Sequence, residues 1–86
     1  MKTGIVVGHV WATKRLRELP AGALLEIDLE PGPGGSGRER IVAIDTLGCG
    51  EGERVLVVQG SVARAWFAGE RVVIDALVIG SLDEKP

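Results

Sequence analysis

The sequence predicts an all-β protein with one short helix, arranged as a small five-stranded barrel. Short runs rich in β-branched residues recur along the 86 residues, and glycine or proline turns separate them. Glycine occurs 13 times, about twice its usual share, which indicates many tight turns or close backbone approaches. A chain of this length has room for one hydrophobic core, so residues 1–86 are expected to form a single domain.

Three strands are predicted in the first half of the chain. The first, Ile5–Ala12, is rich in β-branched residues. A polar connection, Thr13–Gly22, leads to the second strand, Leu24–Leu29. Apolar and acidic residues alternate along this strand, so one of its faces is expected to be exposed to solvent. The third strand, Arg40–Ile44, returns after a flexible hairpin tip at Pro31–Gly37.

A glycine-rich loop, a strand and a helix follow in the second half. The loop Asp45–Glu53 contains three glycines and one cysteine, and the apolar run Arg54–Gln59 after it is the fourth predicted strand. The helix is predicted at Val62–Phe67, with Ser61 as its N-cap and Gly69 as its end.

The fifth strand is predicted at Arg71–Gly80, and residues 81–86 are expected to form a tail. Five strands with a helix between the last two describe an OB-like β-barrel. The first, fourth and fifth strands are nearly continuous in apolar residues, so they should be covered on both faces. One six-residue helix is too small to cover three strands, and we therefore expect a homo-oligomer.

The sequence offers no group of side chains suited to catalysis, cofactor binding or metal binding. Cys49 and His9 are the only thiol and the only imidazole, and no pattern places them with an orienting third group. A metal site needs three or four ligands, far more than these two supply. The glycines around Cys49 could form a nest for an anion, but Glu51 and Glu53 favour turn geometry instead. We expect a protein that is not an enzyme, with no cofactor and no metal.

Composition argues against nucleic acids and membranes as partners. The net charge is −2 with both signs interspersed, and only three residues are aromatic. No apolar run approaches the ~18 residues that span a bilayer, and a single cysteine forms no intramolecular disulfide. These features favour a cytoplasmic protein. An OB-fold nucleic-acid-binding module is the first alternative, and an enzyme or ligand-binding protein that uses the Cys49 loop is the second.

Four motifs stand in one order along nearly the whole chain: Gly8–Lys14, Asp45–Glu53, Gly60–Arg64 and Asp75–Asp83. Together they resemble the opening strand, glycine loop, helix turn and closing strand of the EutN/CcmL family, the pentameric vertex proteins of bacterial microcompartment shells. The chain departs from the family pattern at Cys49, where alanine is usual, and at Ser81, where isoleucine is usual. Ser81 is expected to weaken an apolar contact near the last strand.

The resemblance implies a structural role. Five copies would form a flattened pentagonal plate with a narrow central hole, and such plates would close a shell built otherwise of hexameric or trimeric tiles. The expected partners are therefore copies of the chain itself and these shell tiles, and the expected location is the shell of a microcompartment. The excess of apolar strand faces agrees with this implication, because it requires an oligomer independently.

Two sets of residues are candidates for roles in the ring. The interface of a ring is heterologous, so different patches of neighbouring copies meet. We expect the first, fourth and fifth strands to supply its apolar core through Val57, Val78 and Ile79. We expect the glycine loop to lie near the fivefold axis, where only glycine backbones fit closely, through Gly48, Cys49, Gly50, Glu51 and Gly52.

Overall fold

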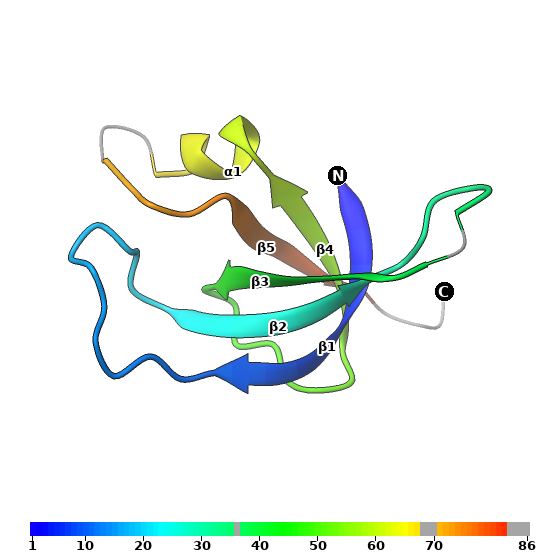
Figure 1. Ribbon diagram of the computed structural model, residues 1–86, viewed down its shortest axis with the longest axis horizontal. Coiled ribbons are helices and arrows are strands. Elements are labelled where there is room, and N and C mark those ends of the chain that lie inside the picture. The colour runs from blue at the N-terminus through cyan, green and yellow to red at the C-terminus, as the bar shows by residue number, and fades with distance from the viewer. Residues whose placement is uncertain (36, 68–70, 83–86) are drawn as a thin grey trace.

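The computed structural model describes residues 1–35, 37–67 and 71–82. These residues form a closed five-stranded barrel with one short helix (Figure 1). The elements, in chain order, are β1 (Lys2–Val10), β2 (Ala23–Leu29), β3 (Glu39–Asp45), β4 (Arg54–Gln59), α1 (Ser61–Ala65) and β5 (Ala76–Leu82). Around the barrel the strands follow the order β1-β2-β3-β5-β4, and β3 and β5 are the one parallel pair of neighbours. The prediction of an all-β, OB-like barrel with one helix is confirmed.

Strand β1 joins the two halves of the barrel, because it pairs with β2 on one side and with β4 on the other. The strands pass very close together at Gly4. A Cβ atom there would lie 2.7 Å from Cγ2 of Ile27 and 2.8 Å from the carbonyl oxygen of Asp28. Only glycine fits at this position without a shift of the backbone, which is the close approach that a glycine inside a strand indicates.

The last strand differs most from its predicted range. Residues 71–75 are not part of β5, which begins at Ala76 and continues through Leu82, so Ser81 and Leu82 belong to the strand and not to a tail. Residues 71–75 instead form an irregular segment in which Ile74 packs against the outside of the barrel and Val73 donates its N–H to the carbonyl of Glu18 at 3.0 Å. Residue 36 of the predicted hairpin tip and residues 83–86 of the predicted tail lie outside the described residues.

Helix α1 begins one residue before its predicted start, and Ser61 does not cap it. Gly60 occupies the N-cap position with φ of 70°, and no side chain caps the helix. Gly60 reaches this left-handed conformation without strain, and its N–H donates to the carbonyl of Asp75 at 2.7 Å. The helix ends at Ala65, two residues before the predicted end, and Gly69 lies outside the described residues.

The interior of the barrel holds the main hydrophobic core. Alternate residues of each strand point inward, as Leu25, Ile27 and Leu29 of β2 do. Burying a side chain of this size contributes roughly 1.5–3 kcal/mol, so this interior is a major source of stability. Its buried members are Val6, Leu25, Ile27, Leu29, Ala43, Cys49, Val55, Val57, Ala76 and Val78.

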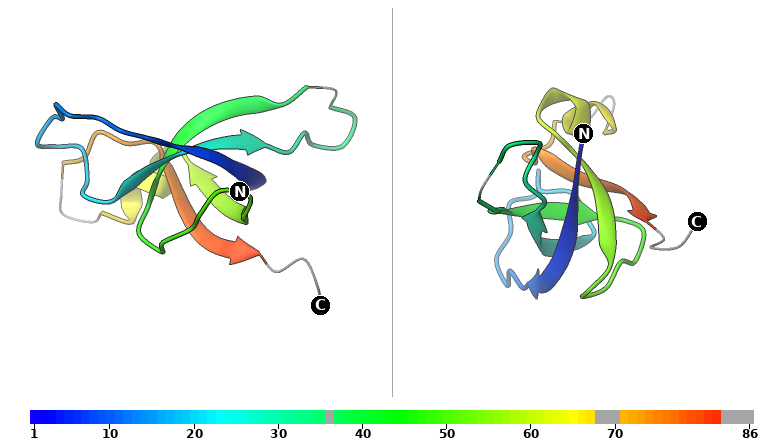
Figure 2. Two further views of the ribbon diagram at one scale, coloured as in Figure 1. Left: turned by 90° about the horizontal axis from the view of Figure 1, so that it is seen from below. Right: turned by 90° about the vertical axis from the view of Figure 1, so that its right-hand side faces the viewer.

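A second core lies outside the barrel wall and includes Ala63 of α1. Helix α1 packs against the outside of the barrel (Figure 2). One outward row crosses four strands, because Leu24 pairs with Ile44, Ile44 with Leu77, and Leu77 with Val58. The chain covers this row with Ala63 of α1 and with Val10, Leu19, Phe67 and Ile74 from β1 and the flanking segments. The short helix and these segments therefore cover more of the outer face than the sequence predicted for the helix alone.

Large apolar side chains still remain on the surface. The large apolar side chains that are at least 40% exposed are those of Met1, Trp11, Leu16, Val42, Leu47, Val62, Trp66, Val73 and Ile79. Single exposed apolar residues are ordinary, but both tryptophans of an 86-residue chain are among these nine.

Candidate functional site

The glycine loop between β3 and β4 is held by a carboxylate from its own chain. Asp45, at the end of β3, is 3% exposed. Its side chain accepts hydrogen bonds from the backbone N–H groups of Leu47, Gly48 and Cys49, at 3.0, 3.0 and 2.8 Å. The N–H groups of residues 47–49 do converge on one acceptor, but that acceptor is the Asp45 carboxylate of the same chain, which agrees with the expectation that the glycines serve turn geometry.

A second carboxylate, Glu53, closes the other end of the loop. It accepts a hydrogen bond from the N–H of Gly50 at 2.9 Å and another from the hydroxyl of Ser81 at 2.8 Å. These hydrogen bonds hold the pKa of Glu53 below its ordinary value, and the bond from the Gly50 N–H has the larger effect. The Ser81 hydroxyl is thus a polar link between β5 and the loop, a role that the sequence did not indicate.

The loop is also fastened to β1. The N–H of Gly52 donates to the carbonyl of Val6 at 2.8 Å, and the N–H of Val6 donates to the carbonyl of Glu53 at 3.0 Å. Gly48 and Gly52 have φ of 89° and 85°, in the left-handed region that favours glycine. The loop thus has a defined shape that its own chain determines.

Cys49 lies inside this loop as a buried thiol. Burial, reinforced by the nearby carboxylates of Asp45 and Glu53, raises its pKa to about 11. A nucleophilic cysteine needs a lowered pKa, so this environment disfavours the reactive thiolate.

His9 is exposed and stacks on Trp11, with the ring centroids 6.0 Å apart. Across the described ranges, no group of three or more His, Cys, Asp or Glu side chains is placed to hold a metal ion.

The predicted interface residues lie in two different environments. Val57 and Val78 are 0% and 1% exposed and belong to the core of the chain's own barrel. Their side chains are therefore not available to a neighbouring copy, and this part of the prediction is wrong. Ile79 follows Val78 in β5, points outward and is 40% exposed.

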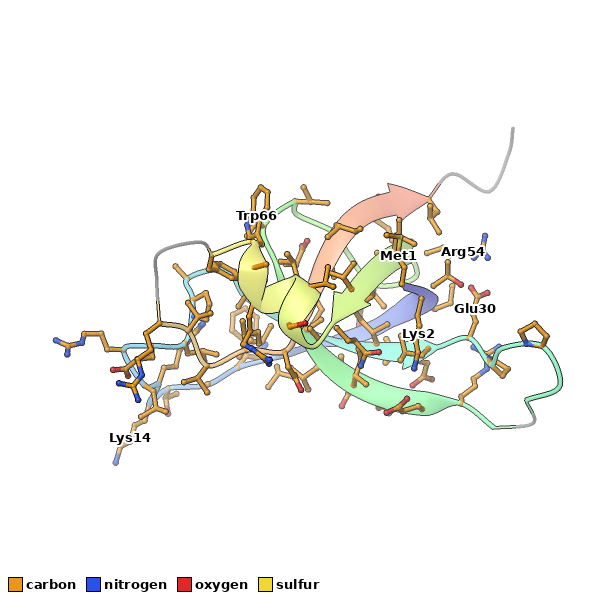
Figure 3. All side chains as sticks on the ribbon, turned by 90° about the horizontal axis from the view of Figure 1, so that it is seen from above. Met1, Lys2, Lys14, Glu30, Arg54 and Trp66 are labelled. Carbon is orange, nitrogen blue, oxygen red and sulfur yellow. The ribbon has the colours of Figure 1, made fainter. Side chains whose placement is uncertain are left out.

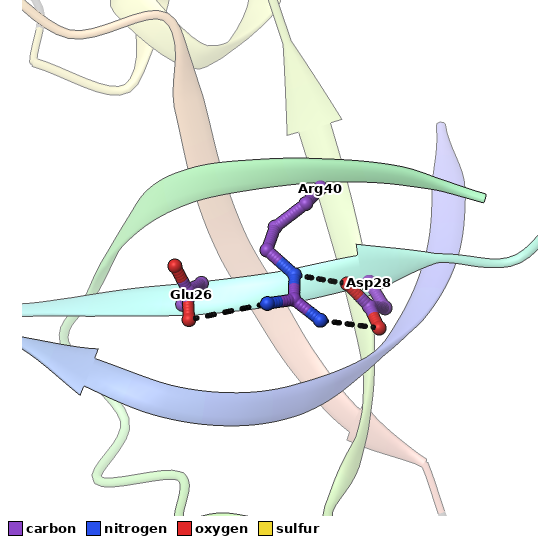
Figure 4. Close-up of polar contacts among 3 residues, drawn as sticks. All are labelled: Glu26, Asp28 and Arg40. Carbon is purple, nitrogen blue, oxygen red and sulfur yellow. Dashed lines mark hydrogen bonds and ion pairs between the residues drawn. The ribbon is translucent and has the colours of Figure 1, made fainter.

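The outer face of β2 and β3 carries ion pairs. Arg40 binds Asp28 through two hydrogen bonds of 2.6 and 3.1 Å, and its Nη1 lies 3.7 Å from Glu26 (Figure 4). The hydrogen bond from Arg40 holds the pKa of Asp28 below its ordinary value. Elsewhere on the barrel, Arg54 at the start of β4 binds Glu30, just after β2, in the same bidentate way at 2.7 and 3.1 Å (Figure 3). Both arginines are therefore paired with carboxylates, whereas a nucleic-acid groove needs cations that remain available for phosphates.

No helix within the described ranges is long and apolar enough to cross a membrane. The fold and the loop define a small OB-like barrel protein whose most distinctive segment is shaped by its own hydrogen bonds. Residues 1–83 match the family described as "Ethanolamine utilisation protein EutN/carboxysome". The chain belongs to this EutN/CcmL family.

Its relatives are shell proteins. The chain is 38% identical over 84 residues to the bacterial microcompartment shell vertex protein EutN of Salmonella typhimurium, a match that covers 98% of this chain and 85% of EutN. It superposes on a pentameric shell protein from the RMM microcompartment with a TM-score of 0.83 and 49% identity, covering 100% and 94% of the two chains. It superposes on the pentameric microcompartment shell protein GrpN of Rhodospirillum rubrum with a TM-score of 0.78 and 35% identity, covering 96% and 94%. These comparisons support a shell role and not the nucleic-acid alternative.

Proposed function

We propose that this chain is a structural subunit of a bacterial microcompartment shell, and that five copies form a ring at each vertex of the shell. The observation that carries the proposal is the match to the EutN/CcmL family over residues 1–83, together with the 49% identity to a pentameric shell protein. The loop geometry agrees with a non-catalytic role, because the carboxylates of Asp45 and Glu53 hold its shape and its thiol is buried with a raised pKa.

The surface of the single chain also supports a ring. The chain exposes 5811 Å², whereas a compact monomer of 9.1 kDa exposes about 4,900 Å². A standard contact removes ~800 Å² from each partner, so a subunit with a neighbour on each side would bury ~1,600 Å², which is more than this excess. A ring with one such contact on each side would cover apolar side chains that the barrel leaves exposed.

The physical function of a five-membered ring follows from geometry. Six-sided tiles fill a plane and cannot close a shell, and five-sided units supply the curvature at its corners. The chain would therefore meet hexameric or trimeric shell proteins along the outer edge of its ring. That contact should be smaller and more polar than the contacts within the ring, since it forms between preassembled parts.

The loop residues Gly48, Cys49, Gly50, Glu51 and Gly52 are proposed to lie near the fivefold axis. Gly50 supports this placement, because it has no left-handed φ and a Cβ there would meet Glu53 only at an ordinary 3.7 Å. Its own chain therefore does not require glycine at this position. Gly50→Phe should disrupt the ring, whereas Gly32→Phe in the hairpin tip, where a Cβ meets no atom within 4 Å, should leave it intact. Equal ring formation by both variants would count against the axial placement.

Ile79 remains a proposed contact residue on the outer face of β5. Ile79→Asp should weaken ring formation without unfolding the barrel, because the side chain lies outside the core. A retained ring in this variant, seen by size-exclusion chromatography with light scattering, would remove Ile79 from the interface.

Shell closure tests the function itself. Hexameric shell tiles are produced with and without this chain, and the particles are imaged by electron microscopy. The proposal predicts closed polyhedra only when the chain is present, and open sheets or tubes without it. Closed polyhedra in its absence, or no change on its addition, would contradict a role at the vertex.

A further inference from the structure

The end of strand β1 presents an aromatic side chain that its own barrel does not cover. Trp11 is 87% exposed and is the more exposed of the two tryptophans. Its ring stacks on that of His9, with the centroids 6.0 Å apart, so the indole is partly ordered before any partner binds. An exposed tryptophan is a typical anchor residue for a partner protein.

The segment that contains this anchor is cationic. Residues 9–17 include three cations and no carboxylate, so their net charge is +3. All three cations, Lys14, Arg15 and Arg17, are exposed. The Arg15 guanidinium donates a hydrogen bond to the carbonyl of Pro20 at 2.8 Å, whereas Lys14 and Arg17 form no ion pair with any residue that the structure describes.

The β3–β4 loop carries the opposite charge. Residues 45–53 include three carboxylates and no cation, so their net charge is −3. Asp45 and Glu53 hold the loop through backbone N–H groups. Glu51 is exposed and binds no other side chain within the described ranges, and Leu47 beside it is 56% exposed. The loop thus presents an apolar side chain and a carboxylate from a fixed backbone.

The charged groups around the two segments leave this contrast in place. The described charged residues that border residues 9–17 directly or through the segment 71–75 sum to zero, and they are Glu18, Arg64, Arg71 and Asp75. Those that border the loop sum to −1, and they are Glu26, Asp28 and Arg40, with the neutral pair Glu30 and Arg54. Attraction between the two regions is therefore expected.

The end of β1 and the β3–β4 loop lie on the same side of the barrel, away from α1 (Figures 1 and 2). Strand β1 borders the loop, since Gly52 donates to the Val6 carbonyl and a Cβ atom at Gly8 would lie 3.8 Å from Oε1 of Glu51. A loop near a fivefold axis meets only parts of the next copy that also lie near that axis. In each chain these are the parts beside the loop, a condition that the end of β1 meets and α1 does not.

We propose that the end of β1 of one copy packs against the β3–β4 loop of the next copy around the ring. Trp11 would cover Leu47, and Lys14, the first cation after Trp11, would face Glu51. A closed ring joins two different patches of the same chain, and these two are complementary in charge and both apolar at their centre. The inference rests on the proposed ring and on the proposed axial place of the loop, and it adds the contact between neighbouring copies.

Tryptophan quenching tests this contact directly. Trp11 is the only tryptophan of the Trp66→Phe variant, and Trp66 is the only one of the matched Trp11→Phe variant. In the single chain Trp11 is the more exposed of the two, so the contact predicts a reversed order in the ring: acrylamide should quench Trp11 weakly and Trp66 strongly. Each variant is first shown to be pentameric by native mass spectrometry. Quenching of Trp11 as strong as that of Trp66 in the ring overturns the proposal.

Exchange of charges gives a second readout. Glu51→Lys should weaken each contact on the order of tenfold, because it places like charges together. Addition of Lys14→Glu to this variant should recover ring formation, since the pair is then restored with its signs exchanged. Glu39→Lys, which reverses an exposed carboxylate at the start of β3, is the matched control and should leave the ring intact. A combined variant no more pentameric than Glu51→Lys alone overturns the proposal.

Failure of this inference is distinguishable from failure of the proposed function. Native mass spectrometry of the unmodified chain reports the ring independently of any substitution. A ring of five in which Trp11 remains open to acrylamide overturns the β1 contact alone, whereas an unmodified chain that is not pentameric overturns the proposed function and the contact together.

Discussion

Removal of the Asp45 carboxylate is expected to destabilise the protein strongly, because this side chain accepts three hydrogen bonds within one loop. The N–H of Cys49 is buried, and leaving it unpaired costs about 1–3 kcal/mol. The N–H groups of Leu47 and Gly48 are partly accessible to water, so each loses only the net value of its bond, about 0.5–1.5 kcal/mol. These contributions sum to about 2–6 kcal/mol, and because two of the three N–H groups can bond water instead, the Asp45→Ala change should cost about 3 kcal/mol in the free energy of unfolding.

Thermal unfolding followed by circular dichroism measures this effect. A loss of about 3 kcal/mol corresponds to a fall in Tm of roughly 12–24 °C for a domain of this size. All variants are compared at one protomer concentration, since dissociation of an oligomer makes Tm depend on concentration. Asp75→Ala, which removes an exposed aspartate, is the control and should change stability by about 0.5 kcal/mol or less. A Tm for Asp45→Ala within about 4 °C of the unmodified protein would refute the reasoning.

Three further outcomes are expected. Gly4→Ala should lower the Tm clearly in a thermal melt, because its Cβ would lie 2.7 Å from Ile27, whereas Gly8→Ala, with no contact below 3.7 Å, should change it little; equal effects would contradict the close approach. The lowered pKa of Glu53 adds stability that is present above the unfolded-state pKa near 4.5 and is lost as pH falls through the lower folded value. Glu53→Gln should therefore flatten the acid limb of the stability profile, and an unchanged limb would exclude this contribution. The Cys49 thiol, buried and with a pKa of about 11, should react with a thiol reagent only after denaturation; rapid labelling of the native protein would show that the loop is open.

Much of the barrel could be predicted because its strands follow simple patterns. The alternation of Leu25, Ile27 and Leu29 with acidic residues specifies both the strand and its buried face. Strand β4 has the predicted bounds, since a glycine loop precedes it and Gly60 follows it. The fifth strand begins five residues later than predicted, because Ile74 of the apolar run 72–74 packs on the second core from outside the strand.

The roles of single apolar residues could not be predicted where both faces of a strand are apolar. Val57 and Val58 are adjacent in β4 and both buried, but Val57 lies inside the barrel and Val58 lies beneath α1. Alternation along a strand shows which side chains point inward only when the other face is polar. In β4 both faces are apolar, so the sequence could not show which of these residues would be exposed to a partner subunit. The expectation that Val57 and Val78 contact a neighbouring copy fails for this reason.

The loop was recognised, but the groups that hold it were not. Asp45 precedes a glycine-rich turn, and aspartate in such a position often accepts hydrogen bonds from the next few backbone N–H groups, so a local signal for its role existed. The Ser81 hydroxyl bonds Glu53, which is 28 residues away in the chain. That link depends on the register of β4 and β5 and could not be read from either segment alone.

The number of subunits tests the central claim most directly. Native mass spectrometry of the purified chain, at protein concentrations across the micromolar range, should show one dominant species at five times the 9.1 kDa protomer mass. A dominant monomer, dimer or hexamer throughout that range would contradict the proposal that the chain forms the pentameric vertex of a microcompartment shell.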